Sequence, residues 1–291
     1  MICEDYVTAS TTEEALAILA SLRGQGRLIA GGTDLVIQLQ RGERTVGCLV
    51  DITRIPGLDE IKLQDSYIIV GATVTHSQVE RSPLIRERAP VLAEACSKVG
   101  SPQIRNVGTL AGNVVNAQPA ADGSIALLAL DAEAQIANLT GRQWVPIASL
   151  FVSPGVSRVD ATTEMITAFR FRAQAPRESS AFERLARRKA VALPLINVGV
   201  RVLLDADGSH IRDARIAIGP VARVPFRAQE AEAILRDRPI NEETIDEAVE
   251  TAARESKPRT SLLRASREYR RELIRVLTQR ALLRVIKTAR G

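Results

Sequence analysis

The sequence predicts a mixed fold of the α+β class, divided into more than one compact unit. Short apolar segments that alternate like strands, such as residues 164–171, stand beside longer segments that begin with a helix cap, such as residues 241–255. In the last third of the chain, predicted strands come first and helices follow, which indicates a sheet with helices on one face. With 291 residues, 45% of them hydrophobic, the chain is long enough for two or three units with cores of their own.

The first predicted unit, residues 1–56, is expected to hold one helix and two short strands. Thr11 and Glu14 have the spacing of a capping box, which predicts the start of the helix. Apolar runs at residues 28–30 and 49–52 predict the strands. A proline–glycine pair after the second strand is expected to form the turn that ends the unit.

The second predicted unit, residues 57–174, combines hairpins with helices. Thr140, Gly141 and Arg142 lie between two strand-like segments, as hairpin turns do. Pro90 is expected to kink or restart the longer helix, because proline lacks the amide hydrogen that a helix interior needs. Strands are expected at residues 60–63, 67–71, 134–138, 143–147 and 164–171, and helices are expected to begin at Thr75 and at Leu84.

The third predicted unit comprises residues 175–291. A turn at residues 205–208 separates two of its three strands. Asn241 is expected to cap a helix whose first turn is acidic. Strands are expected at residues 180–185, 195–204 and 210–218, and helices at residues 226–235, 241–255 and 261–287.

Two segments rich in glycine and other small residues stand out as a candidate ligand site. The first reads Ala-Gly-Gly-Thr-Asp at residues 30–34, directly after a predicted strand. The second covers residues 103–131, carries hydroxyl and amide side chains, and ends in a predicted helix. Small residues let a backbone approach a ligand closely, so that amide hydrogens can bind phosphate directly. Two strand-to-turn sites of this kind, about 75 residues apart, predict one phosphate-bearing cofactor held between two loops.

A simpler interpretation stays open for each loop taken alone. Glycine pairs often form tight turns, and runs of small residues often reflect close packing. Neither loop has the glycine spacing of the common dinucleotide fold or of the P-loop, so both of those site types are disfavoured. The two loops together favour a cofactor site more strongly than either one does.

The remaining composition narrows the function classes. Three scattered cysteines, Cys3, Cys48 and Cys96, form no metal-binding motif and predict a reduced, cytoplasmic protein without an iron–sulfur cluster of its own. The two histidines, His76 and His210, stand outside the glycine loops, and His76 is interpreted as structural. No apolar run approaches the ~20 residues that span a bilayer, and no secretory signal is expected.

The net charge of +5 arises mostly from arginine. Late in the chain, arginines recur at helical spacing with glutamates between them, which is typical of a solvated helix face with ion pairs. A nucleic-acid surface is the weaker alternative, because no aromatic side chains for base stacking are interleaved. The arginines in question are Arg264, Arg267, Arg271 and Arg275.

The order of the motifs resembles that of a known family. Residues 30–34 (Ala-Gly-Gly-Thr-Asp), 104–113 (Ile-Arg-Asn-Val-Gly-Thr-Leu-Ala-Gly-Asn) and 119–122 (Pro-Ala-Ala-Asp) are similar to the FAD-binding, or medium, subunit of the molybdenum hydroxylases. Residues 71–76 and 186–190 extend the resemblance over nearly the whole chain. The family includes the medium subunit of carbon monoxide dehydrogenase and the flavin domain of xanthine dehydrogenase.

The resemblance implies a two-lobed FAD-binding fold of the PCMH type, with a small N-terminal lobe, a larger α/β lobe and a C-terminal domain of sheet and helices. It also implies the cofactor contacts. A first loop wraps the pyrophosphate, a second loop reaches the phosphates and the flavin, an acidic residue hydrogen-bonds the cofactor, and an apolar and a basic residue lie beside the flavin ring. In this sequence these are Ile29, Ala30, Gly31, Gly32, Thr33 and Asp34; Thr109, Ala111, Gly112, Asn113 and Asn116; Asp122; and Ile166 and Lys189.

Two of these positions carry alternatives. Ala111 stands where the family usually has glycine. If that position needs a left-handed backbone, alanine costs about 1 kcal/mol and alters the affinity for FAD and its pose. Lys189 either stabilises the reduced flavin by its charge or is a surface member of the basic run 187–189.

The implied function is electron transfer through FAD. A large partner subunit with molybdopterin and a small one with [2Fe-2S] clusters are expected, assembled as a dimer of heterotrimers, with NAD, a quinone or oxygen as the electron acceptor. No catalytic side chain and no metal ligand is assigned to this chain. A stand-alone flavin oxidoreductase of the same fold and a scaffold subunit that has lost FAD are the alternatives.

Overall fold

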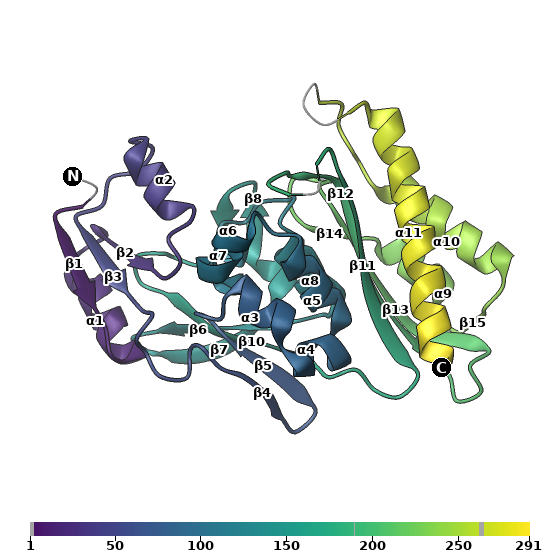
Figure 1. Ribbon diagram of the computed structural model, residues 1–291, viewed down its shortest axis with the longest axis horizontal. Helices are drawn as coiled ribbons and strands as arrows, with labels where there is room; N and C mark the ends of the chain where they lie inside the picture. The colour runs from purple at the N-terminus through teal and green to yellow at the C-terminus, as the bar shows by residue number, and fades with distance from the viewer. Residues whose placement is uncertain (1–2, 189, 262–264) are drawn as a thin grey trace.

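The computed structural model describes residues 3–188, 190–261 and 265–291, and it confirms the mixed α+β architecture (Figure 1). A three-stranded sheet and two five-stranded sheets follow one another along the chain. In Figure 1 they extend from the purple N-terminal end to the long yellow helix at the C-terminus. None of the helices in the described ranges is long and apolar enough to cross a membrane.

The first sheet is parallel, with β3 (Cys48–Asp51) between β1 (Asp5–Thr8) and β2 (Gly26–Ile29). Parallel neighbours need crossover connections, and helices supply them. The chain passes through α1 (Thr12–Ser21) between β1 and β2, and through α2 (Leu35–Gln40) between β2 and β3. Each helix packs its own apolar cluster with the strands.

The start of α1 follows the predicted capping signal. Thr11 Oγ1 accepts a hydrogen bond from the Glu14 amide at 3.0 Å. The Glu14 carboxylate folds back to the amide of Ser10 at 2.7 Å, one residue earlier than in a regular capping box. The first turn is thereby satisfied, and Leu16 and Leu19 face the core.

The central sheet is antiparallel. It comprises β4 (Ile61–Gln64), β5 (Tyr67–Gly71), β6 (Glu133–Asn138), β7 (Gly141–Pro146) and β10 (Met165–Arg172). β4 pairs with β5 and β6 pairs with β7, as the two predicted hairpins require. β10 joins the hairpins, in the order β4-β5-β10-β6-β7. Between β7 and β10, a 3-10 turn η1 (Ile147–Leu150) leads to a ribbon of β8 (Phe151–Ser153) and β9 (Val156–Ser157), which the sequence did not predict.

One face of the central sheet is covered by helices (Figure 1). They are α3 (His76–Arg81), α4 (Pro83–Arg88), α5 (Pro90–Ser97), α6 (Pro102–Val107), α7 (Leu110–Val115) and α8 (Asp122–Ala129). Pro90 restarts the longer helix, as predicted. The prediction of a strand before the second glycine segment is wrong, because that segment opens in the short helix α6 and continues in α7.

The third sheet is also antiparallel and carries its helices on one face (Figure 1). Its strands are β11 (Glu178–Ala186), β12 (Pro194–Leu204), β13 (His210–Gly219) and β14 (Phe226–Arg227), and β15 (Arg238–Pro239) pairs with β13. The helices are α9 (Gln229–Leu235), α10 (Glu242–Glu255) and α11 (Arg267–Arg290).

Two predicted helix starts in this last unit are corrected. The helix expected from residue 226 begins at Gln229, since the two residues before Ala228 pair with β13. The helix expected from residue 261 begins at Arg267, where Ser266 accepts a hydrogen bond from the Tyr269 amide at 3.2 Å. Arg264, one of the arginines of the predicted solvated face, lies outside the described residues.

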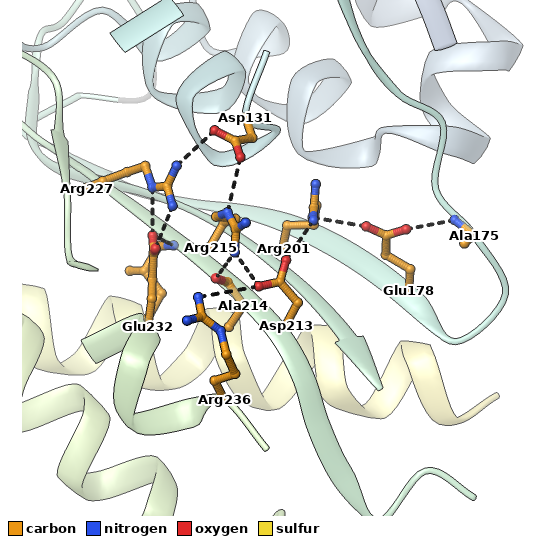
Figure 2. Close-up of polar contacts among 11 residues, drawn as sticks. Asp131, Ala175, Glu178, Arg201, Asp213, Ala214, Arg215, Arg227, Glu232 and Arg236 are labelled. Carbon is orange, nitrogen blue, oxygen red and sulfur yellow. Dashed lines mark hydrogen bonds and ion pairs between the residues drawn. The ribbon is translucent and has the colours of Figure 1, made fainter. Parts of the chain in front are cut away.

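Helix α8 lies between the central unit and the third sheet. All of its residues are buried. At its C-terminal end, Asp131 accepts hydrogen bonds from Arg227 at 2.9 Å and from Arg215 at 3.4 Å (Figure 2). Because Arg227 also pairs with Glu232 of α9 at 2.7 Å, an ionic chain runs from the central unit into the helices of the third unit.

Candidate cofactor site

A cavity of about 690 Å³ lies where the first sheet meets the helices of the central unit. Its volume is within the roughly 300–1,000 Å³ of typical small-molecule sites. The structure brings together on its walls all of the predicted site residues that it describes, except Asp122. These are Ile29, Ala30, Gly31, Gly32, Thr33, Asp34, Thr109, Ala111, Gly112, Asn113, Asn116 and Ile166.

The first glycine loop turns the chain from β2 into α2. Gly32 has a φ of 64°, a left-handed conformation that glycine adopts without strain. Its carbonyl accepts a hydrogen bond from the Val36 amide at 2.9 Å, which opens the first turn of α2. Asp34 stands at the N-cap position but makes no capping hydrogen bond, so its carboxylate is not needed to close the helix.

The two glycine loops touch each other through their backbones. A methyl group in place of the Gly31 hydrogen would lie 1.9 Å from the Val107 carbonyl oxygen and 2.9 Å from Gly108 Cα. No side chain can be accommodated at such distances, so position 31 requires glycine for space rather than for backbone angle. The contact closes one side of the cavity and joins the first sheet to the helices of the central unit.

The second loop is held from behind by the segment that leads into α3. The Leu110 amide donates to the Val74 carbonyl, and the His76 amide donates to the Gly108 carbonyl, both at 3.0 Å. Thr109 caps α7 by accepting a hydrogen bond from the Gly112 amide at 3.0 Å. The loop is therefore a rigid junction between α6 and α7, with its small residues turned to the cavity.

Ala111 lies inside α7, 8% exposed, and its backbone is right-handed. The condition for backbone strain at this position is therefore not met, because a helical residue needs no left-handed φ. Ala111 lines the cavity with its methyl group instead.

Asn113 links the cavity to α8. Its Oδ1 atom accepts a hydrogen bond from the Ser124 amide at 3.2 Å, which satisfies a free N–H group in the first turn of α8. Asn116, at the C-terminal end of α7, lines the cavity without a hydrogen bond to another described side chain. Both amides thus present polar atoms to the cavity.

Asp122 points away from the cavity, into the contact with the third unit. Its carboxylate accepts hydrogen bonds from Asn197 at 2.6 Å and from Arg184 at 3.2 Å. Burial raises the pKa of Asp122 to about 6, and the nearby Arg184 guanidinium opposes this shift. Arg184 also donates to the Ala192 carbonyl, so the same group fixes the loop between β11 and β12.

The two remaining predicted residues are Ile166 and Lys189. Ile166 is buried in β10 beside a register shift and faces the cavity. Lys189 lies outside the described residues. Leu193, in the loop between β11 and β12, does line the cavity, and it is 63% exposed.

Sequence reasoning missed several wall residues, including Arg27, Arg44 and His76. Arg27 could have been found, because side chains alternate along a strand and Arg27 shares a face with Ile29. His76 stands in one of the quoted motifs but was interpreted as structural. Arg44 follows α2 without any local signal.

A second cavity, of about 540 Å³, lies on the opposite face of the central sheet. Its walls combine the start of α1 with strand residues such as Lys62, Gln135 and Trp144. It shares no wall residue with the first cavity and contains neither glycine loop.

A family model described as the FAD binding domain in molybdopterin dehydrogenase matches residues 2–171. The chain belongs to the FAD-binding subunits of the molybdenum hydroxylases. A second model, the CO dehydrogenase flavoprotein C-terminal domain, matches residues 180–285. The family membership, the FAD cofactor and the oxidoreductase class expected from the sequence are thereby confirmed.

Similar proteins span the full length of this FAD-binding subunit. It is 32% identical over 289 residues to a xanthine dehydrogenase FAD-binding subunit of Escherichia coli. The aligned region covers 98% of this chain and 97% of the relative. This subunit is 34% identical to the 6-hydroxypseudooxynicotine dehydrogenase complex subunit alpha of Paenarthrobacter nicotinovorans, over 98% and 95% of the two chains. A solved carbon monoxide dehydrogenase from Hydrogenophaga pseudoflava superposes with a TM-score of 0.91 at 27% identity, over 99% and 98% of the chains.

The residues around the cavity fit FAD. The first loop contributes Gly31, Gly32 and Thr33 to the wall, and their backbone amides and the Thr33 hydroxyl are groups that can bind a pyrophosphate. The apolar side chains of Ile166 and Met165 lie in another part of the wall, as an aromatic ring requires. The cations Arg27 and Arg44 are also wall residues and offset the cofactor's negative charge.

Proposed function

We propose that this subunit holds FAD in the cavity between its two glycine loops and passes electrons through it. The electrons come from [2Fe-2S] clusters of a small partner subunit and leave to NAD, a quinone or oxygen. The observation that carries the proposal is the convergence of both loops on one cavity. FAD supplies the redox chemistry when bound, and the protein supplies binding, orientation and electrostatics.

Within this proposal, the first loop binds the pyrophosphate through backbone amides of Ala30, Gly31 and Gly32, with the Thr33 hydroxyl beside them. Thr109, Gly112 and the two amides of α7 hold the chain that leads to the flavin, and Ile166 packs against the ring. For Lys189 we propose the first of its two alternatives, a place beside the flavin, as the resemblance implies. Asp122 acts indirectly, since it holds Arg184 and so the loop that carries Leu193.

The exposed apolar residues of the cavity wall support the proposal that a partner subunit binds at the mouth of the cavity. Wall residues with large exposed apolar side chains gather there, which is unusual on the surface of a monomer and typical of an interface. Their exposed fractions are 37% for Ile104, 40% for Val115, 49% for Val156 and 63% for Leu193. A partner seated on this rim would also shield the flavin end from water.

We further propose that a large molybdopterin subunit oxidises the substrate and that the complex is a dimer of heterotrimers in the cytoplasm. Relatives that carry the name of a subunit in a dehydrogenase complex support the assembly. The free thiols of Cys3, Cys48 and Cys96 suit a reducing compartment.

We propose the domain division 1–56, 57–174 and 175–291. It is supported by three sheets whose strands lie within these ranges and by apolar clusters that are largely separate. The two family models also meet near the second boundary, between residues 171 and 180. The flavin-free scaffold is disfavoured, because its chief support was strain at Ala111.

The first test is the visible absorption spectrum of the purified chain, with the released cofactor identified after heat denaturation. A flavin spectrum that yields FAD is expected. A colourless chain that takes up no added FAD, alone or with its partner subunits, would contradict the proposal.

The site itself is tested with two matched glycine variants. Gly32 and Gly42 have φ values of 64° and 68°, so Gly32→Ala and Gly42→Ala carry similar backbone strain, about 1 kcal/mol each. Gly32 lines the cavity, whereas Gly42 faces open space. Titration of the apoprotein with FAD should show weakened binding for Gly32→Ala alone. Equal FAD affinity in the two variants would refute the loop assignment.

A further inference from the structure

His76 is a buried imidazole in the wall of the cofactor cavity. It begins α3, is 2% exposed, and is held through its backbone amide to Gly108 of the second loop. Its Cδ2 edge faces the same loop, since a methyl group on Gly108 would lie 3.6 Å from that atom. The ring therefore lies directly behind the loop that is expected to contact the cofactor.

The other edge of the ring meets a thiol. His76 Nδ1 lies 3.4 Å from Sγ of Cys96, which is fully buried in α5. Burial raises the pKa of the Cys96 thiol, so it keeps its proton. Burial, with a smaller contribution from the Arg105 charge, lowers the pKa of His76 to about 4, so the imidazole is neutral at physiological pH.

A neutral imidazole has one N–H donor and one acceptor nitrogen. A thiol sulfur is a weak acceptor and an unprotonated imidazole nitrogen is a good one, so the contact favours the thiol as donor and Nδ1 as acceptor. The proton of the ring then sits on Nε2. Nε2 has no hydrogen-bond partner among the described residues. It is also absent from the set of unpartnered polar atoms that are sealed off from solvent. It is therefore accessible from the cavity that His76 lines.

We propose that Cys96 fixes the tautomer of His76, so that Nε2–H is held as a neutral hydrogen-bond donor toward an oxygen atom of the flavin nucleotide. The inference rests on the proposed function, because it needs FAD in the cavity. His76 is then a binding residue, and Cys96 is a positioning residue that acts through it. A neutral donor complements Arg27 and Arg44, since it fixes an oxygen without adding charge.

The tautomer is read directly by NMR of the apoprotein labelled with ¹⁵N-histidine. The chain has only 2 histidines, so His210, an exposed residue at the start of β13, is an internal reference. Long-range proton–nitrogen spectra should show His76 as the Nε2–H tautomer. Addition of FAD should move the Nε2 resonance of His76 and leave that of His210 in place.

Binding variants give a second readout that needs no turnover. His76→Gln keeps an amide donor at about the reach of Nε2, whereas His76→Phe keeps the ring volume and removes the donor. FAD titration should show about a tenfold weaker Kd for His76→Phe, the loss of one hydrogen bond, and a near-normal Kd for His76→Gln. Cys96→Ala should mix the tautomers, while Cys96→Ser, which keeps a donor, should not.

The outcomes separate the inference from the proposed function. If wild-type protein binds no FAD, the proposed function fails. If it binds FAD while Nε2 does not move and His76→Phe keeps full affinity, the inference fails and the proposed function stands. Should His76→Phe not fold, the wild-type spectrum decides, because an Nδ1–H tautomer or an unmoved Nε2 resonance overturns the inference.

Discussion

Two buried titratable side chains, His76 and Asp122, lie near the cofactor cavity. Burial shifts their pKa values in opposite directions. It lowers the pKa of His76 to about 4 and raises the pKa of Asp122 to about 6. In both cases the neutral form is favoured, because an ion loses hydration when it is buried. At pH 7 the His76 imidazole is therefore neutral, whereas Asp122 remains largely ionised beside Arg184.

The shift at His76 predicts acid sensitivity. An unfolded histidine has a pKa near 6.5, so between about pH 6.5 and 4 the unfolded chain binds a proton that the native chain does not. The associated stability is present above that window and is lost as the pH falls through it. Between pH 7.5 and 4.5 the loss is about 2–3 kcal/mol.

Urea unfolding of wild type and His76→Gln at pH 7.5 and 4.5 measures this loss. The wild type should lose about 2–3 kcal/mol more than the variant over that range. His210→Gln, at the exposed first residue of β13, is the control for replacing a histidine. The same pH dependence in wild type and His76→Gln would show that the native imidazole takes up the proton.

At the scale of residues, the sequence identified the cavity walls well and side-chain direction poorly. Gly31 and Thr33 could be assigned because small and hydroxyl residues in a loop have few other uses. Asp122 could not, because its direction is set by Arg184 and Asn197, partners 62 and 75 residues away. Ala111 was judged by residue type, but its strain depended on whether the loop was helical.

Among the elements, α9 depends on one buried carboxylate for its attachment. Glu232 accepts hydrogen bonds from the Ile216 amide at 2.9 Å and from two nitrogens of Arg227, at 2.9 and 2.7 Å. Removing it leaves a half-buried guanidinium and a buried strand amide without that partner. The remaining Asp131–Arg227 contact is partly exposed and weaker (Figure 2).

Glu232→Ala should therefore lower the free energy of unfolding by about 3 kcal/mol. Glu230→Ala is the matched control, because Glu230 lies in the same helix and its side chain is 68% exposed. It should change stability by less than about 0.5 kcal/mol. Denaturant unfolding measures both, and equal losses would show that the buried network adds nothing beyond helix propensity.

Elements with a local signal were predictable, and those without one were not. Thr11, Thr75 and Asn241 cap helices as their side chains indicate. The short helices α6 and α7 were missed because each has only 6 residues, too few to show a helical repeat of apolar side chains. β14 was missed because its two residues pair with β13, a tertiary contact that no local pattern encodes.

In the whole molecule, glycines let the third sheet approach the central unit closely. A methyl group on Gly219 would lie 2.5 Å from the Pro119 carbonyl oxygen, which belongs to the segment before α8. A methyl group on Gly199 would lie 3.1 Å from Ala129 Cβ, a distance that a small shift can relieve. A methyl group should therefore be tolerated better at position 199 than at position 219.

Gly219→Ala should cost about 2–3 kcal/mol of unfolding free energy, and Gly199→Ala less than about 1 kcal/mol. Gly219→Ala should also weaken FAD binding, since Pro119 is joined to the cavity wall through Ala121. Thermal unfolding and FAD titration test both statements. If Gly219→Ala had unchanged stability, the Pro119 carbonyl oxygen could not lie as close to position 219 as the structure shows.

The proposed division into units rests on local patterns in the sequence, whereas the packing of these units has no such pattern. Each unit has its own strands and helices, and local patterns report them. The contact between Asp131 and Arg227 joins residues 96 positions apart, and many other arginines could have paired with that carboxylate. Which pair forms depends on how α8 lies on β13, and the sequence holds no local record of that.

The backbone contact at Gly31 also constrains how this protein can evolve. The atoms in the way belong to the main chain of residues 107 and 108, and every amino acid at those positions carries them. No side-chain substitution at position 107 or 108 can therefore compensate for a substitution of Gly31. In a genetic screen for revertants of Gly31→Ala, we expect true reversion to glycine and none among the nineteen side-chain alternatives at position 107.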